Sequence, residues 1–195
     1  MGMSAILSIF CAALAQDDAS HFPLIPESRW VYKTREHRWS TKVGEPGPEK
    51  DGLPRTVLCQ DGKESPTLRT SDGTSASAVR VMVTRDGVYQ NSVDPANLIL
   101  KFPLKKFDDW GAGDRKNGLS RFANHGQHDL EIGGTRYRCW KITEQRAVSR
   151  GLRTWTRWYA PGVGLVCEEF TEETDGIVVK RSALLDSYEK EGSRK

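Results

Sequence analysis

Residues 152–171, LRTWTRWYAPGVGLVCEEFT, contain two extended runs around a tight turn. The first run, from Leu152 to Tyr159, alternates threonine and arginine with aromatic residues, a composition typical of strands. Between the runs, Pro161 and Gly162 occupy the second and third positions of a four-residue turn, as a type II turn requires. The stretch therefore predicts an antiparallel β-hairpin.

The same period-two patterns occur along the rest of the chain, and no window of 11 or more residues has a helical apolar stripe. Strands are expected at residues 29–37, 56–60, 78–84, 88–92, 98–104, 130–132, 136–143, 163–171 and 177–185. Asp86-Gly87, Gly133-Gly134 and Asp175-Gly176 are typical hairpin turns. We predict an all-β fold with little helix: one curved antiparallel sheet of 8–10 strands, as a half-barrel or a closed barrel.

Four polar or Pro/Gly-rich segments are expected to be loops. Residues 45–54 contain three prolines and two glycines, and residues 61–77 are polar and rich in turn formers. Residues 108–118 combine glycine with charge. Residues 124–129 contain His125 and His128 on either side of Gly126.

Phe-Pro-Leu occurs twice, and each copy is followed by tryptophan at the same offset. Phe22-Pro23-Leu24 precedes Trp30, and Phe102-Pro103-Leu104 precedes Trp110. Proline fixes φ, and the three apolar side chains can anchor a core. The repeat predicts a structural device used twice, and the turn residues Pro161, Gly162 and Gly164 are predicted to be structural as well.

Residues 1–15 are uncharged and mostly apolar, and Ala13-Leu14-Ala15 fits the small-x-small rule for signal cleavage. The predicted organisation is a signal peptide (1–15), one antiparallel β domain (16–189) and a disordered tail (190–195). A buried N-terminal helix is the alternative. Cys11 follows Phe10, which is too large for a lipoprotein signal. We expect a bacterial protein exported to the periplasm or beyond, not membrane-spanning.

Three cysteines follow the predicted cleavage site, at spacings unlike those of zinc motifs: Cys59, Cys139 and Cys167. In a meander, Cys139 and Cys167 lie two strands apart, roughly 9–10 Å, which exceeds the reach of a disulfide. Any disulfide is therefore expected to involve Cys59, and three buried free thiols are the alternative.

Several stretches resemble a family of uncharacterised exported bacterial proteins, sometimes labelled TapB-like. They are Phe22-Pro23-Leu24 before Trp30-Val31-Tyr32, the later Pro103-Leu104 and Trp110, the segment 134–142, and Trp158 to Val166. Lys105-Lys106-Phe107 departs from the glycine that the family usually has after its second Pro-Leu. The resemblance implies an exported β-domain without an established activity or cofactor.

No organised catalytic set is present: the sequence has neither a nucleophile elbow nor a phosphate loop. Glu168 and Glu169 would point to opposite faces of a strand, unlike a glycosidase pair. His125 and His128, with Asp129 and Glu131 nearby, are weak metal candidates, so no metal or cofactor and no catalytic residue is assigned.

Basic and aromatic residues interleave in 136–141 and 153–159, which a solvated sheet face with cation–π contacts would explain. The net charge of +3 is small, and no nucleic-acid partner is expected, whereas an anionic glycan or lipid headgroup remains an alternative.

The aromatic residues are the main candidates for a binding surface. Candidates for the concave face, which alternatively fill the core, are Trp30, Tyr32, Trp110, Trp140, Trp155 and Trp158. The sequence therefore predicts a non-catalytic exported domain whose curved sheet binds an apolar small molecule or lipid, or an envelope or extracellular protein. A metal-dependent enzyme using His125 and His128, and a purely structural cell-surface module, are the alternatives.

Overall fold

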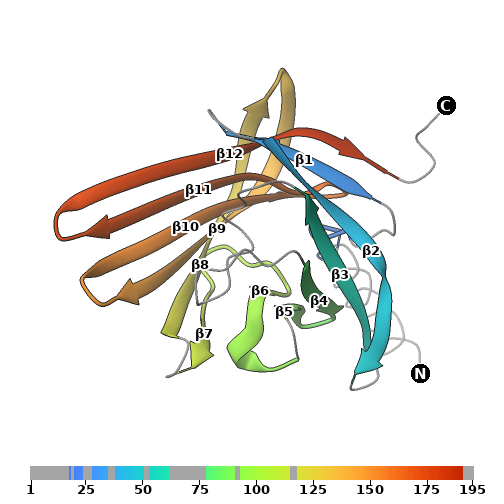
Figure 1. The fold of residues 1–195 in the computed structure, drawn as a ribbon, viewed down its shortest axis with the longest axis horizontal. Helices are drawn as coiled ribbons and strands as arrows, with labels where there is room; N and C mark the ends of the chain where they lie inside the picture. Colours follow the sequence, from blue (N-terminus) through green and yellow to red (C-terminus); the bar gives the residue numbers. More distant parts are fainter. Residues whose placement is uncertain are drawn as a thin grey trace, which may run out of the picture.

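The computed structural model describes residues 18, 20–23, 28–34, 38–50, 53–61, 78–90, 93–114 and 118–190. In these residues twelve strands form one sheet with antiparallel pairing throughout (Figure 1). The strands are β1 (Arg29–Lys33), β2 (Arg38–Lys50), β3 (Leu53–Asp61), β4 (Ala78–Thr84), β5 (Gly87–Gln90), β6 (Leu98–Lys101), β7 (Asp109–Asp114), β8 (Gly118–Ile132), β9 (Thr135–Val148), β10 (Gly151–Ala160), β11 (Gly164–Thr174) and β12 (Ile177–Glu189). The all-β prediction is confirmed, although the strands outnumber the predicted 8–10.

The strand order is β6-β5-β4-β3-β2-β1-β12-β11-β10-β9-β8-β7. Neighbours in the sheet are neighbours in the chain except at β1 and β12, where the first and last strands pair. The hydrogen-bonded sheet is interrupted between β6 and β7, which are consecutive in the chain but lie at the two edges and are not paired with each other. The sheet is therefore curved but open, and the closed-barrel alternative is wrong.

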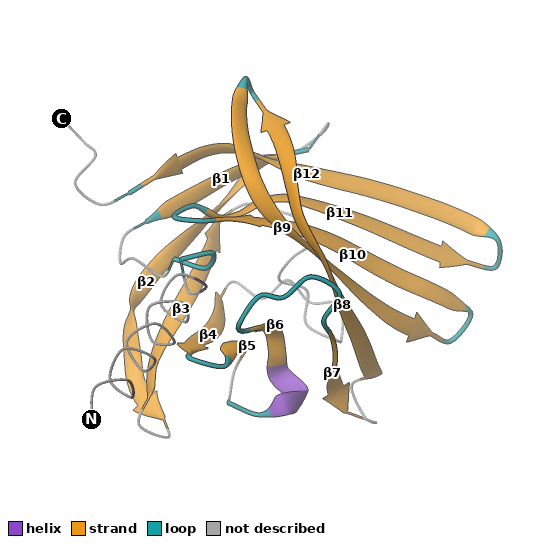
Figure 2. Ribbon diagram, turned by 180° about the vertical axis from the view of Figure 1, so that it is seen from behind, coloured by secondary structure: helices purple, strands orange, loops and turns teal. Residues whose placement is uncertain are grey.

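The two edges approach each other because the segment from Phe102 to Asp108 connects them directly (Figures 1 and 2). The indole Nε1 of Trp110 in β7 donates to the carbonyl of Leu98 in β6 at 3.3 Å. A short 3-10 helix, Pro95–Asn97, precedes β6, with Asp94 as its N-cap. The described residues contain no helix that is long and apolar enough to cross a membrane.

Tight turns connect the long strands as the sequence predicts. Val163 N donates to Ala160 O at 3.3 Å, and Gly162 has φ +71°, so residues 160–163 form the predicted type II turn. Two-residue turns at Gly133-Gly134 and Asp175-Gly176 connect β8 to β9 and β11 to β12. At the β4–β5 hairpin the turn residues are Arg85 and Asp86, one position earlier than predicted, since Thr84 pairs with Gly87.

Three segments predicted as loops are strands. Residues 45–54 belong largely to the β2–β3 hairpin, where breaks in register between Val43 and Pro46, and between Gly47 and Lys50, accommodate the prolines. Residues 108–118 contain β7. Residues 124–129 lie within β8, where the register shifts between Asn124 and Gln127 at Gly126, whose φ is +90°. Proline and glycine mark bulges here and do not end the strands.

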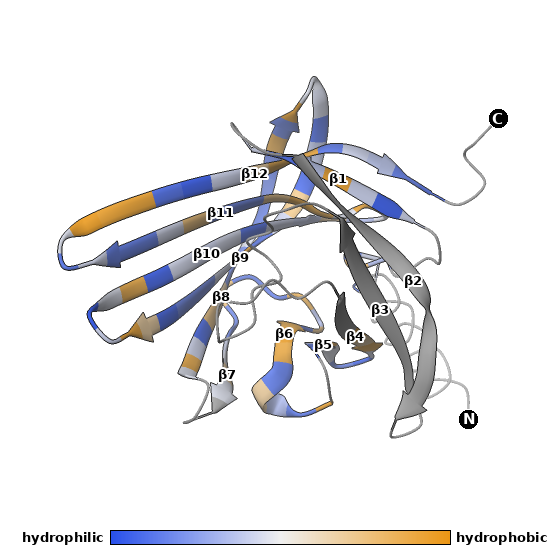
Figure 3. Ribbon diagram, in the orientation of Figure 1, coloured by the Kyte–Doolittle hydropathy of each residue, from blue (hydrophilic) through white to orange (hydrophobic). Residues whose placement is uncertain are grey.

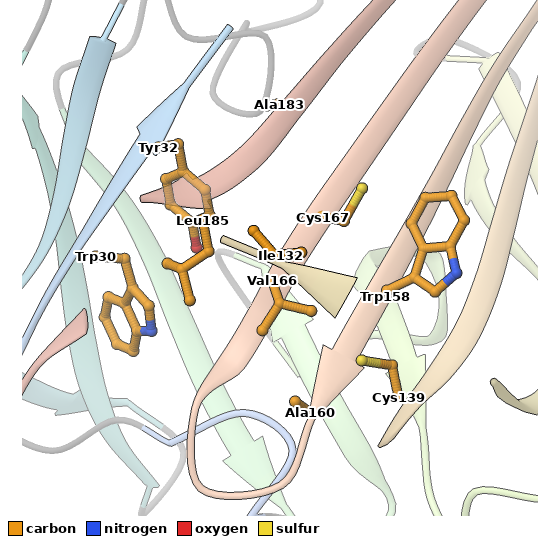
Figure 4. Packing of buried hydrophobic residues seen from close by; sticks show 10 residues of the cluster. All are labelled: Trp30, Tyr32, Ile132, Cys139, Trp158, Ala160, Val166, Cys167, Ala183 and Leu185. Carbon is orange, nitrogen blue, oxygen red and sulfur yellow. The ribbon is translucent and has the colours of Figure 1, made fainter. Parts of the chain in front are cut away.

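Two clusters of buried apolar residues form the core. The first core cluster comes from β1 and β8–β12 and consists of Trp30, Tyr32, Ile132, Cys139, Trp158, Ala160, Val166, Cys167, Ala183 and Leu185 (Figure 4). The second core cluster connects the two edges of the sheet and consists of Val88, Leu100, Phe102, Leu104, Ala112, Phe122, Ile142 and Tyr159. We call the sheet face that carries Phe122, Ile142 and Tyr159 the inner face.

Several predictions lie outside the described residues. They are the signal peptide (1–15), the residue Leu24, most of the polar stretch 61–77 and most of the predicted tail. Cys59 lies in β3, but its side chain is outside the described part of the structure.

Candidate functional site

A buried arginine lies between two carboxylates on the inner face. Arg157 in β10 is directly opposite Glu168 in β11, and its Nε donates to Glu168 Oε2 at 2.7 Å. Its Nη1 donates to Glu144 Oε2 in β9 at 2.8 Å. Only 16% of the Arg157 side chain is exposed, with 9% for Glu144 and 3% for Glu168. We call these three residues the charge triad.

Further polar side chains extend the triad toward β8. Ser120 Oγ donates to Glu144 Oε1 at 2.8 Å, and Arg146 Nε donates to Ser120 Oγ at 2.9 Å. Both oxygens of Glu144 therefore accept hydrogen bonds, whereas Glu168 Oε1 is buried and has no hydrogen-bond partner. This asymmetry gives the two carboxylates different electrostatic environments.

Burial raises the pKa of Glu168 above its usual range, although Arg157 acts in the opposite direction. Burial would also raise the pKa of Glu144, but the net shift is downward. The groups that lower this pKa are Arg157, through its charge and hydrogen bond, Ser120, through its hydrogen bond, and Arg146, through its charge. Burial raises the pKa of Tyr159 to about 12, with opposing contributions from Arg157 and the two glutamates. The triad therefore holds a proton more readily on Glu168 than on Glu144.

Beside the triad lies an aromatic pair that belongs to neither core cluster. Trp155 in β10 and Phe170 in β11 are cross-strand partners, and their ring centroids are 5.1 Å apart at 47°. Both side chains are half-buried. The guanidinium carbons of Arg146 and Arg157 each lie 5.9 Å from the Trp155 ring. These contacts agree with the cation–π interactions expected for segment 153–159.

The other predicted binding aromatics belong to the core or pack against it. The Trp30 indole donates to the Val163 carbonyl, and Tyr32 OH donates to the Leu165 carbonyl at 3.0 Å. Trp158 is buried in the first core cluster, while Trp110 and Trp140 pack against the second. Among the six candidates, only Trp155 neither belongs to a core cluster nor packs against one.

The Phe-Pro-Leu copies both pack around the second core cluster. Phe102 and Leu104 are members, and Phe22 packs against the cluster with its ring 6.2 Å from that of Tyr159. Pro23 packs closely against Gly164, whose φ is +90°. A Cβ added at Gly164 by substitution would lie 3.2 Å from Cδ of the proline ring. Pro103, Pro161 and Gly162 are exposed. These contacts anchor the N-terminal segment against the β10–β11 turn.

The two histidines do not form a metal-binding group. His125 Nε2 lies 2.8 Å from Thr143 Oγ1, and His128 is opposite Cys139 in β9. Burial, followed by the charges of Lys141 and His128, lowers the pKa of His125. Within the described part of the chain, no group of three or more His, Cys, Asp or Glu side chains is placed to hold a metal ion.

Cys139 and Cys167 are buried free thiols, as the two-strand separation predicts. They lie in β9 and β11 on either side of β10. Because both are free, neither is paired with Cys59, and the alternative of buried free thiols holds for Cys139 and Cys167.

The charge triad was missed by sequence reasoning, which placed Arg157 on a solvated face and considered Glu168 only together with Glu169, as a glycosidase pair. The sequence signal that could have revealed the triad was the period-two alternation of side chains along β10 and β11. Arg157 lies two residues from both Trp155 and Tyr159, and Glu168 lies two residues from both Val166 and Phe170. A charge that shares a strand face with such side chains is expected to be buried and paired.

No protein-family model matches the sequence, and no curated protein matches it significantly. The TapB-like resemblance therefore stays a prediction. Similar solved structures include a lipoprotein from Parabacteroides distasonis (13% identity, 87% of this chain, 98% of that chain, TM-score 0.42). Another is the lipoprotein YmcC from Escherichia coli K12 (11% identity, 96% of this chain, 98% of that chain, TM-score 0.33).

A structure from Bacteroides fragilis, described as an exported protein with a YmcC-like fold, covers 87% of this chain and 98% of its own. Its TM-score is 0.50 at 11% identity. At this identity the similarity concerns architecture alone, and the chain accordingly resembles proteins of YmcC-like fold.

Proposed function

We propose that this protein is a non-catalytic exported domain that binds an apolar segment of an envelope or extracellular protein on the inner face of its sheet, at Trp155 and Phe170. The observation that carries the proposal is the half-buried Trp155–Phe170 pair, which lies outside both core clusters. Aromatic side chains that the core does not use are typical anchors of binding surfaces.

The surroundings of this pair favour a protein segment over a small molecule. Arg153, Glu172 and Val179 lie opposite one another on the same face of β10, β11 and β12, two residues from the row of Trp155 and Phe170. Val179 is exposed, and the Arg153–Glu172 ion pair has an Nη2–Oε1 distance of 3.0 Å. Arg181 of β12 lies opposite Phe170, so apolar and charged side chains alternate over these three strands. A mixed surface of this kind suits an extended partner segment, whereas small-molecule sites enclose most of the ligand.

Export is supported by two observations of different kinds. Residues 1–15 have the composition of a signal peptide, and the B. fragilis protein with a similar fold is described as exported. We therefore place the protein in the periplasm or outside the cell, where its partner would be found.

Photo-crosslinking tests the proposed surface. Benzoylphenylalanine at position 170 is expected to crosslink a protein in native cells, and Trp155→Ala is expected to reduce the adduct strongly. The matched control is benzoylphenylalanine at Leu119, an exposed apolar residue elsewhere in the sheet. Equal adducts at 119 and 170, or no adduct at 170, would contradict the proposal. An extractable added mass in native mass spectrometry, lost in Trp155→Ala, would replace the protein partner with an apolar small molecule.

A further inference from the structure

Phe107, in the segment that connects β6 to β7, is the most exposed large apolar side chain among the described residues. It is 79% exposed, and it is the one aromatic residue in a group that otherwise includes the tip of β12, where Figure 3 shows Ile177, Val178 and Val179 as an apolar end of the sheet. Single exposed apolar residues are common on protein surfaces, so exposure alone assigns no role to this ring.

The backbone holds Phe107 in a conformation that a bulky residue rarely adopts. Its φ is +65°, a value that glycine reaches without strain. Phe107 N donates to Asn124 O at 2.7 Å, and Asn124 N donates to Asp108 O at 2.8 Å. Asp108 N donates to Lys105 O at 3.2 Å. These bonds tie the segment to β8, so the ring is presented from a fixed backbone, and strain of this kind concentrates at functional sites.

The bulge in β8 positions a cation beside the ring. Lys106 Nζ lies 4.7 Å from the centroid of the Phe107 ring, within range of a cation–π contact. A Cβ added at Gly126 would lie 2.7 Å from Lys106 Cγ, so the glycine leaves room for the stem of the lysine. The irregular stretch of β8 at Gly126 therefore places an ammonium group and an exposed aromatic ring side by side.

The charge around the ring is positive. Lys105 and Lys106 are both exposed, and neither forms an ion pair with a carboxylate in the described part of the chain. The two aspartates that follow Phe107 are already neutralised by ion pairs, Lys101–Asp108 at 3.0 Å and Arg121–Asp109 at 3.1 Å. The segment therefore presents one apolar ring and two ammonium groups that have no carboxylate partner.

We propose that Phe107, Lys105 and Lys106 form a contact with an anionic lipid bilayer. The ring enters the boundary between headgroups and acyl chains, and the two ammonium groups lie at the level of the lipid phosphates. An exported protein in the periplasm is within reach of such a surface. The contact shares no residue with the surface at Trp155 and Phe170, so the two proposals are independent.

The size of the apolar group favours a bilayer over a protein partner. One aromatic side chain buries about 150–250 Å², whereas each partner in a stable protein interface buries about 800 Å². The neighbours of Phe107 in the segment are exposed lysines, which do not enlarge the apolar area. A bilayer accepts a single inserted ring and surrounds it with phosphates, which complement the two lysines.

Sedimentation with sucrose-loaded vesicles tests the contact on the full exported chain. Vesicles of equal parts phosphatidylglycerol and phosphatidylcholine are expected to bind the wild-type chain with a partition constant of about 10³–10⁴ M⁻¹, comparable to one acyl chain. Pure phosphatidylcholine vesicles are expected to bind about tenfold more weakly or less, and Lys105→Gln is expected to weaken binding to the anionic vesicles about fivefold. Leu119→Ala is the matched control, since it removes an exposed apolar side chain elsewhere and should leave binding within about twofold.

Two replacements of the ring separate lipid binding from stability. Phe107→Ala and Phe107→Gly are both expected to lower the partition constant about tenfold or more, because both remove the apolar side chain. The glycine variant should have the higher urea midpoint of the two, since only glycine adopts φ +65° without strain. Binding that follows stability and not the presence of the ring would contradict the proposal.

Two further outcomes would overturn it. One is a wild-type chain that binds anionic vesicles no better than phosphatidylcholine vesicles. The other is the absence of vesicle binding together with a protein adduct in cells from benzoylphenylalanine at position 107, which would replace the bilayer with a protein partner.

Discussion

Arg157 Nε donates to Glu168 Oε2 at 2.7 Å, in a pair that joins adjacent strands directly opposite each other on the inner face. The glutamate is almost completely buried, and its second oxygen has no partner. Glu144 binds the same guanidinium from the other side. Arg157 thus binds two carboxylates inside a β-sheet, and Arg146 Nη2 lies 3.4 Å from Glu144 Oε1 as a second cation. The triad is therefore specific in its pairing but sensitive to the loss of any member.

Removing the arginine should therefore destabilise the fold strongly. Arg157→Met keeps much of the side-chain volume but leaves the buried Glu168 without a cation and Glu144 with only the 3.4 Å contact to Arg146 Nη2, for an expected loss of about 3–5 kcal/mol in the free energy of unfolding. Arg153→Met is the matched control on the same strand and face, because its ion pair with Glu172 is partly exposed, at 43% and 29% of the two side chains, and should contribute about 1 kcal/mol or less. Urea unfolding measures both. Similar losses in the two variants would show that the triad is no more important than a surface pair.

The two glutamates should affect stability in different pH ranges. The pKa of Glu168 is raised in the folded state, so its contribution is fully present below about 4.5, its ordinary value, and is lost as the pH rises through the raised pKa. The pKa of Glu144 is lowered, so its contribution is present above about 4.5 and is lost as the pH falls through the lowered pKa.

Unfolding free energies measured across pH should separate these contributions. Glu168→Gln is expected to make the free energy of unfolding less dependent on pH above pH 4.5, and Glu144→Gln is expected to do so below pH 4.5. Each variant acts as the control for the other. If Glu168→Gln instead changed only the acid side, the pKa of Glu168 would be lowered by folding, opposite to the expected shift.

Local turn chemistry explains why the C-terminal half of the fold was predictable. Gly133-Gly134, Pro161-Gly162 and Asp175-Gly176 each specify a tight turn within a few residues, and the strands on either side follow from period two. The same residue types misled the prediction elsewhere. Pro46 and Gly126 lie inside long strands, because irregular pairing with the neighbouring strand absorbs them.

The site required information that a single strand does not contain. Glu144, Arg157 and Glu168 come from three strands and meet only through the register that pairs Arg157 with both Ile142 and Glu168. Their burial also depends on the curvature of the sheet around the second core cluster, which brings β6 close to β7. Alternation alone predicts the face of each residue, whereas its partner follows from the complete strand order.

The two described cysteines should be unreactive in the folded protein. Burial raises the pKa of both Cys139 and Cys167 to about 12, with smaller contributions from nearby acidic groups. At pH 8 roughly one thiol in 10⁴ is then ionised, and burial restricts access further. Iodoacetamide labelling followed by peptide mass spectrometry should show slow modification at 139 and 167 in buffer and rapid modification in urea. Rapid labelling of either residue in buffer would indicate that its strand opens locally.

A pair of glycine substitutions should distinguish close backbone approach from simple flexibility. An ideal Cβ at Gly151 would overlap the carbonyl oxygen of Glu173, a backbone atom of the paired strand β11. Gly151→Ala should therefore force β10 away from β11 at this end and destabilise the fold by about 1–3 kcal/mol. At Gly111 in β7 the nearest atom is the Ser120 carbonyl oxygen, 3.9 Å from the added Cβ, and φ is not positive.

Gly111→Ala should accordingly be neutral or stabilise by about 0.4–1 kcal/mol, through the reduced freedom of the unfolded chain. Both replacements add one methyl group to an exposed strand glycine, so a shared sign of the change in unfolding free energy would contradict the argument. Because Gly151 is the first residue of β10, the strand that carries Trp155 and Arg157, its variant should also weaken the proposed partner crosslink at position 170, whereas Gly111→Ala should leave that crosslink unchanged.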